Sequence, residues 1–94
     1  MEQSLPDEVE AEILQLAASV PDIAQPHDLR TRRIGNHYAI ELHILVDGDI
    51  TLREAHEKAS EVEDLLRRHY GAETHVAVHV EPITASTDSS EPEA

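Results

Sequence analysis

The sequence predicts one small α+β domain, in which two helices cover one face of a three-stranded mixed sheet. Three observations support this. Two stretches place apolar residues at the spacing of a helix face, a Gly-Asn pair divides two extended segments, and a strictly alternating segment follows the second helix. Because that helix connects the second and third strands, a right-handed crossover makes those strands parallel. The 94 residues therefore read as helix, strand, strand, helix, strand.

The first element is a helix predicted over residues 1–22. Ser4 is a candidate N-cap, and Pro6 suits the first turn of a helix, where its missing N–H costs nothing. Apolar residues form one stripe at helical spacing: Val9, Ile13, Leu16, Ala17 and Val20. Pro21 ends the helix, and residues 20–24 are expected to turn onto the next element.

The second element is a β-hairpin with strands over residues 26–34 and 37–46. Gly35 and Asn36 occupy the two central positions of its turn. Alternate residues of the second strand share an apolar face: Tyr38, Ile40, Leu42, Ile44 and Val46. In the first strand Leu29 and Ile34 are out of phase, which predicts a bulge or an edge position.

The most strongly marked helix is predicted over residues 51–70. Thr51 and Glu54 form a capping box at its start, and Gly71 stops it. Its apolar stripe is expected to be buried: Leu52, Ala55, Ala59, Val62, Leu65 and Leu66.

The last strand, over residues 74–82, alternates strictly, with three valines on the side that needs a core. The other side carries His79 and Glu81, two residues and about 7 Å apart along the strand, so both can reach one ion. With Glu41 and His43 of the neighbouring strand they are expected on the sheet face opposite the helices. A solvent-facing strand side also carries His and Glu without any function, and that alternative stays open.

Composition excludes several classes of function. A net charge of −13 opposes binding to nucleic acid or anionic lipid. The absence of cysteine excludes disulfides and thiolate metal sites, and argues against copper(I) and iron–sulfur chemistry. The apolar runs fall far short of the roughly 20 residues of a membrane helix, and the opening residues are acidic rather than a signal peptide. We expect a soluble, cytosolic domain.

The chain is expected to divide into a folded domain at residues 1–82 and a disordered acidic tail at residues 83–94. The tail is rich in Ser, Thr, Asp, Glu and Pro and has few apolar residues. The folded part has no Phe or Trp, so its core must be aliphatic and small. A dimer interface would add buried surface.

Four short motifs carry a resemblance to a known family. They are His27-Asp28-Leu29-Arg30-Thr31-Arg32, Glu41-Leu42-His43, Leu52-Arg53-Glu54-Ala55-His56 and Val78-His79-Val80-Glu81-Pro82. In this order and spacing, over about residues 7–82, they resemble the cytoplasmic C-terminal domain of cation diffusion facilitator transporters. The resemblance implies a ferredoxin-like, metallochaperone-like αββαβ domain. It also implies a V-shaped homodimer that binds Zn²⁺ or a related ion near its interface, closes its arms and regulates the membrane domain.

Carried over residue by residue, the resemblance implies five metal ligands: His27, His43, His56, His79 and Glu81. The family's closing motif often has Asp where this chain has Glu81. Imidazole and carboxylate groups suit Zn²⁺, and also Mn²⁺, Fe²⁺, Co²⁺, Ni²⁺ or Cd²⁺; zinc is the first expectation. Asp28 is expected to orient His27 or to act as a lesser ligand. The remaining histidines, His37, His69 and His75, are interpreted as surface residues.

The leading hypothesis is a metal-binding, dimer-forming regulatory domain of a cation efflux transporter that closes on the metal. The alternative is a free-standing cytosolic metal-binding protein, a buffer or chaperone, with the same fold. A purely structural dimer module with incidental histidines is a third interpretation. An enzyme is not predicted: a metal with an open position could activate water, but no nucleophile–base pair is evident and the serines lie mostly in the tail.

Overall fold

The structure is a computed structural model that describes residues 4–83. Its elements are α1 (Asp7–Ala18), β1 (Ile23–Ile34), β2 (His37–Asp47), α2 (Leu52–Tyr70) and β3 (His75–Ile83). The predicted order and type of all five elements are confirmed. β3 extends to Ile83, one residue beyond the predicted strand, and the rest of the predicted acidic tail, residues 84–94, lies outside the described residues.

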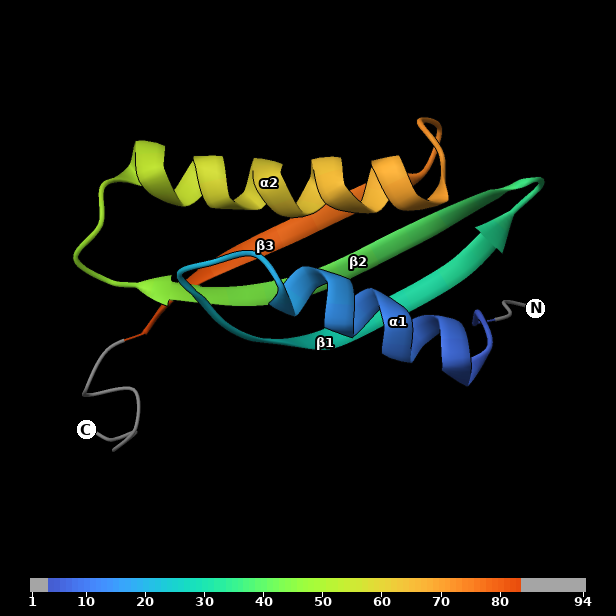
Figure 1. Ribbon diagram of the computed structural model, residues 1–94, viewed down its shortest axis with the longest axis horizontal. Coiled ribbons are helices and arrows are strands. Elements are labelled where there is room, and N and C mark those ends of the chain that lie inside the picture. The colour runs from blue at the N-terminus through green and yellow to red at the C-terminus, as the bar shows by residue number, and fades with distance from the viewer. Residues whose placement is uncertain (1–3, 84–94) are drawn as a thin grey trace.

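The three strands form one sheet in the order β1-β2-β3. β1 is antiparallel to β2, and β2 is parallel to β3, as the helical crossover predicts. Both helices lie on the same side of this sheet, in front of the strands in Figure 1. This confirms the predicted α+β fold, with one face covered and one face open.

The core lies between the helices and the covered face of the sheet. Strand β2 supplies its centre, because every second residue is 0–3% exposed: Ile40, Leu42, Ile44 and Val46. The helices contribute residues from their predicted stripes: Ile13, Ala17, Ala59, Val62 and Leu66. Since side chains alternate along a strand, this packing sends Glu41 and His43 to the opposite, open face.

Three boundary predictions need correction. Helix α1 begins at Asp7 with Pro6 as its N-cap residue and has no side-chain cap, because Ser4 lies two residues too early to reach the first N–H groups. Strand β1 begins at Ile23, inside the predicted turn. Leu52 is 87% exposed rather than buried, because it starts α2 ahead of the turn that packs on the sheet.

The ends of α2 match the prediction. Thr51 and Glu54 form the capping box, with Thr51 Oγ1 accepting from the Glu54 amide at 3.0 Å and Glu54 Oε1 accepting from the Thr51 amide at 2.9 Å. Gly71 ends the helix with a φ of 121°, a conformation that favours glycine. These caps hold α2 in place over the sheet.

Strand β1 is an edge strand with an irregular pairing, as the out-of-phase residues predicted. Its register against β2 shifts twice, between Ala24 and His27 and again between His27 and Arg30. Between these pairs Asp28 adopts a φ of 54°, in the left-handed region that non-glycine residues rarely occupy. The irregularity therefore turns the backbone next to His27.

Candidate metal centre

Three histidines from three strands form a row across the open face of the sheet. His43 lies on the middle strand, opposite His27 of β1 and His79 of β3 in the strand register. The ring centroids of His27 and His43 are 5.5 Å apart, and those of His43 and His79 are stacked at 4.8 Å. Neighbouring strands at equal register thus bring together imidazoles that are far apart in the sequence.

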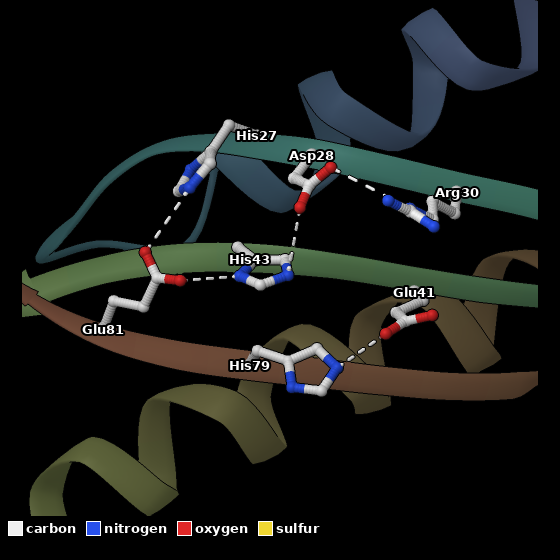
Figure 2. Close-up of polar contacts among 7 residues, drawn as sticks. All are labelled: His27, Asp28, Arg30, Glu41, His43, His79 and Glu81. Atoms are coloured by element: carbon white, nitrogen blue, oxygen red, sulfur yellow. Dashed lines mark hydrogen bonds and ion pairs between the residues drawn. The ribbon is translucent and has the colours of Figure 1, made fainter.

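Glu81 joins two of these imidazoles through its two carboxylate oxygens (Figure 2). Oε2 lies 2.7 Å from His43 Nδ1, and Oε1 lies 3.5 Å from His27 Nε2. One ligand atom from each of these three residues lies within 4.8 Å of the other two. The side chain of His43 is 23% exposed and those of His27 and Glu81 are about half exposed, so the group is open to solvent.

The histidines also favour the ionised form of the carboxylate. A hydrogen bond with His43 lowers the pKa of Glu81, and the charges of His43 and His27 lower it further, against a smaller opposing effect of burial. Glu81 is therefore ionised at neutral pH. An anionic oxygen between two imidazole nitrogens is a suitable environment for a divalent cation.

Two further carboxylates contact the outer nitrogens of the row. Asp28 Oδ2 lies 3.3 Å from His43 Nε2, and Glu41 Oε2 lies 2.8 Å from His79 Nε2. The sequence interpretation had placed Asp28 with His27, whereas the structure places it against His43. Glu41 was expected on this face but was not among the five candidate ligands. Its position two residues before His43 was the signal available in the sequence.

Of the five candidate ligands, the structure brings three into one group. His79 is adjacent to the group through its stacking on His43, but its Nε2 is directed to Glu41. His56 is an exposed residue of α2, which packs on the covered face of the sheet. The sheet therefore separates His56 from the row of histidines within one chain.

The three grouped residues fit a transition-metal ion. They offer two imidazole nitrogens and one carboxylate, a donor set that Zn²⁺ and its neighbours bind readily. Ligand atoms about 2 Å from a tetrahedral ion are about 3.3 Å from one another. The separations of 2.7 and 3.5 Å from Glu81 to the two histidines involve different carboxylate oxygens, and one ligand atom from each residue lies within 4.8 Å of the other two. Small side-chain movements would suffice to surround an ion, with a further ligand entering from solvent or another chain.

Neither helix of the described residues is long and apolar enough to cross a membrane.

Comparison with known proteins gives consistent matches. The family model for the cytoplasmic domain of cation efflux proteins matches residues 5–83. The cation-efflux pump FieF of Escherichia coli O127:H6 is 37% identical over 85 residues, and FieF of Pectobacterium atrosepticum is 36% identical over 86 residues. The matched regions cover 89% and 90% of this chain, and 28% of each relative. The chain thus spans little more than a quarter of the length of these relatives.

Solved structures show the same fold. The zinc form of the transporter CzrB superposes with a TM-score of 0.78 at 29% identity, covering 100% of both chains. A variant of the MamM C-terminal domain gives a TM-score of 0.75 at 26% identity, covering 82% of this chain and 96% of the other. A cadmium form of the same domain gives a TM-score of 0.75 at 25% identity, covering 83% of this chain and 98% of the other. These matches confirm the ferredoxin-like fold class and the family resemblance.

Proposed function

The chain belongs to the cation efflux protein family, of which it is a cytoplasmic domain, and from this premise we propose that it binds a divalent cation on its open sheet face to regulate transport. One observation carries the proposal: ligand atoms of His27, His43 and Glu81 lie within 4.8 Å of one another. Two imidazoles and an ionised carboxylate supply three donors to such an ion. Its remaining coordination positions need further ligands.

Zinc is the proposed ion. The site has nitrogen and oxygen donors and no thiolate, so it favours Zn²⁺, Co²⁺ or Ni²⁺ over copper(I), while Mn²⁺, Fe²⁺ and Cd²⁺ are weaker candidates. The zinc form of CzrB and the cadmium form of the MamM domain support a divalent ion of this kind. A site of exposed histidines and carboxylates, without thiolate, would also empty more readily than a buried structural zinc site.

The remaining ligands are proposed to come from His79 and from His56 of a second copy of the chain. His56 cannot reach the site of its own chain, because the sheet lies between them, so it could contribute only across an interface. Leu52 lies four residues earlier on the same face of α2 and is 87% exposed.

Metal binding is proposed to close the dimer. Each chain carries a net charge of −13, which opposes the close approach of two copies. A divalent cation held between them lowers this repulsion and adds bonds only in the closed arrangement. Because the ion binds the closed arrangement better, it shifts the population toward it. In a full transporter this movement would act on the membrane domain.

The experiment measures zinc binding and the distance between subunits in the same protein. The sequence has no cysteine, so Arg68→Cys, at an exposed position of α2, gives a unique labelling site. We expect zinc to shorten the label-to-label distance in the dimer and to raise the melting temperature. At a hundredfold excess of zinc over its dissociation constant, stabilisation of about 2.7 kcal/mol is expected.

Replacing His79 and Glu81 together with Ala should abolish both effects and leave the dimer intact. His75→Ala, on the same strand outside the site, is the matched control and should behave as wild type. If zinc binds but the distance stays constant at saturation, the domain is a metal buffer rather than a switch. If zinc does not bind at all, the proposed site is wrong.

A further inference from the structure

His43 is held between two carboxylates, one at each ring nitrogen. Its Nδ1 lies 2.7 Å from Glu81 Oε2, inside the proposed site, and its Nε2 lies 3.3 Å from Asp28 Oδ2, on the outer side. It is also the least exposed side chain of the group, at 23%. A neutral imidazole carries a single N–H, so His43 can donate to only one of these carboxylates; once a cation takes the lone pair of Nδ1, the proton must lie on Nε2, which faces Asp28.

Asp28 reaches His43 only because its backbone is unusual. Its φ of 54° lies in the left-handed region, between the two register shifts of β1. Such a conformation costs a non-glycine residue about 1–2 kcal/mol, and strain of this kind is concentrated at functional sites. The second oxygen, Oδ1, lies 3.9 Å from Arg30 Nε, which helps to hold the carboxylate in its orientation. The strained conformation thus aims a fixed acceptor at His43 Nε2.

The same arrangement occurs at His79. Its Nε2 lies 2.8 Å from Glu41 Oε2, and Glu41 comes from the strand next to it. Figure 2 shows both pairs: Asp28 against His43, and Glu41 against His79. In each pair the carboxylate contacts the Nε2 atom, which leaves the Nδ1 atom for another partner.

We propose that Asp28 and Glu41 are positioning residues of the metal site, each accepting the Nε2–H of its histidine so that His43 and His79 bind the cation through Nδ1. This inference rests on the proposed function and adds to it the choice of nitrogen. A carboxylate behind a metal-bound histidine fixes the ring tautomer and orientation and raises the basicity of the ligating nitrogen. The nitrogen so chosen in His43 is the one beside Glu81.

The first test measures directly which ring nitrogen of each histidine carries a proton and which binds the metal. Nitrogen-15 NMR of the zinc-loaded full chain, labelled at histidine, distinguishes a protonated ring nitrogen from a metal-bound one. We expect His43 and His79 each to show a protonated Nε2 and a zinc-bound Nδ1. Zinc on the Nε2 of His43 would overturn the inference, because Asp28 would then face a nitrogen with no proton to donate.

The second test distinguishes an effect of Asp28 on zinc affinity from an effect on folding stability. Asp28→Gly removes the carboxylate and also relieves the left-handed backbone, so folding stability should be unchanged or higher. Zinc affinity should nevertheless fall by about 10–100-fold, the usual effect of losing an outer carboxylate. Asp28→Asn keeps an acceptor oxygen of the same shape and should lose less. An Asp28→Gly variant with wild-type zinc affinity would refute the role of Asp28.

The chain offers a matched control in Asp22. This residue also has a left-handed φ, 69°, and carries the same charge, but its carboxylate contacts Lys58 rather than a histidine. Asp22→Gly should therefore leave zinc affinity unchanged, and an equal loss in both variants would mean that net charge alone is responsible. Glu41→Gln tests the second pair in the same way, with the NMR signals of His79 as its readout.

The two proposals fail in different ways. If the wild-type chain does not bind zinc, the proposed function is wrong and the positioning role falls with it. If the wild type binds zinc and Asp28→Gly binds it equally well, only the positioning role is wrong.

Discussion

Two regions of the molecule contain histidines and carboxylates in similar numbers, yet only one groups them around a common point. The open-face group consists of His27, His43 and Glu81, with ligand atoms within 4.8 Å. The second region lies at the end that carries the β1–β2 turn (Figure 1), and contains His37, His69, Glu12, Glu73 and Tyr70. We call it the turn-end cluster. Among the described residues, only the open-face group meets the geometry of a metal site.

The turn-end cluster is made of separate contacts. His37 Nδ1 lies 3.8 Å from Glu73, and His69 Nε2 lies 3.4 Å from Glu12. The Tyr70 hydroxyl donates to Glu12 at 2.6 Å, which joins α2 to α1. Burial first, and then Glu12, raise the pKa of Tyr70 well above its usual value. This region holds the two helices together and keeps the tyrosine uncharged.

The difference lies in strand register rather than in composition. On the open face, His27, His43 and His79 lie at equal register on adjacent strands, which are about 5 Å apart, and Glu81, two residues beyond His79, reaches diagonally to His43 and His27. In the turn-end cluster the groups come from both helices, the start of β2 and the loop after α2, and their contacts are separate pairs rather than one shared point. Among the described residues, histidines and a carboxylate converge only where neighbouring strands place them side by side.

The sharpest contrast between the two regions should appear in histidine substitutions. His43→Ala removes a proposed direct ligand, so zinc affinity should fall by more than the roughly 100-fold upper limit for loss of an outer carboxylate. His79→Ala should also weaken binding strongly. His69→Ala, in the turn-end cluster, should leave the affinity unchanged. Calorimetric titration measures all three, and equal affinities would remove the distinction between the regions.

Acid should weaken zinc binding to the open-face group by at least about 100-fold between pH 7.5 and 5.5 through His27 and His43 alone, and by more if His79 also binds. Imidazole must be neutral to bind a metal, and with an unperturbed pKa of about 6.5 each ligating histidine contributes about tenfold over this range. The lowered pKa of Glu81 keeps that carboxylate ionised, so the loss belongs to the histidines. Competition titrations at several pH values measure it. A flat affinity would mean that carboxylates alone hold the ion.

Shortening the bridging carboxylate should have a smaller effect. Glu81 contacts His43 and His27 through different oxygens, and Glu81→Asp withdraws the carboxylate by one methylene. Loss of one charge-assisted contact of the two should lower zinc affinity by about tenfold, or about 1.4 kcal/mol. Glu73→Asp at the turn end is the matched control. Unchanged affinity in Glu81→Asp would show that the carboxylate does not span both histidines.

The smallest effect is expected in the turn-end cluster and should not involve metal. Tyr70→Phe removes the hydrogen bond to Glu12 and should cost about 0.5–1.5 kcal/mol of folding stability at neutral pH, with zinc affinity unchanged. The raised pKa of Tyr70 means that the folded chain keeps the phenol proton where the unfolded chain loses it. Wild-type stability should therefore fall as the pH rises above about 10, and less so in Tyr70→Phe.

Denaturant unfolding at pH 8 and pH 11 measures this difference. Tyr38 remains in both proteins, so the comparison isolates Tyr70. An equal loss of stability at pH 11 in both would show that Tyr70 is not held uncharged by its surroundings.

Much of the fold followed from the sequence because it depends on local periodicity. The alternation of Ile40, Leu42 and Ile44 determines which side of β2 is buried, and thereby places His43 on the open face. The capping box at Thr51 and the stop at Gly71 determine the ends of α2. Two of the motifs that carry the family resemblance lie on β2 and β3, where the same alternation places His43, His79 and Glu81 on the open face.

Only the tertiary structure decided which of the candidate residues meet. Two register shifts and a left-handed residue in β1 turn Asp28 toward His43 and away from the partner that adjacency in sequence suggested. His56 belongs to one of the four family motifs but lies in α2, on the far side of the sheet from the other candidate ligands. Periodicity assigns a residue to a face, because it is a property of one segment. Contacts depend on how segments that are distant in sequence pair with one another, and the sequence of a single segment does not determine that pairing.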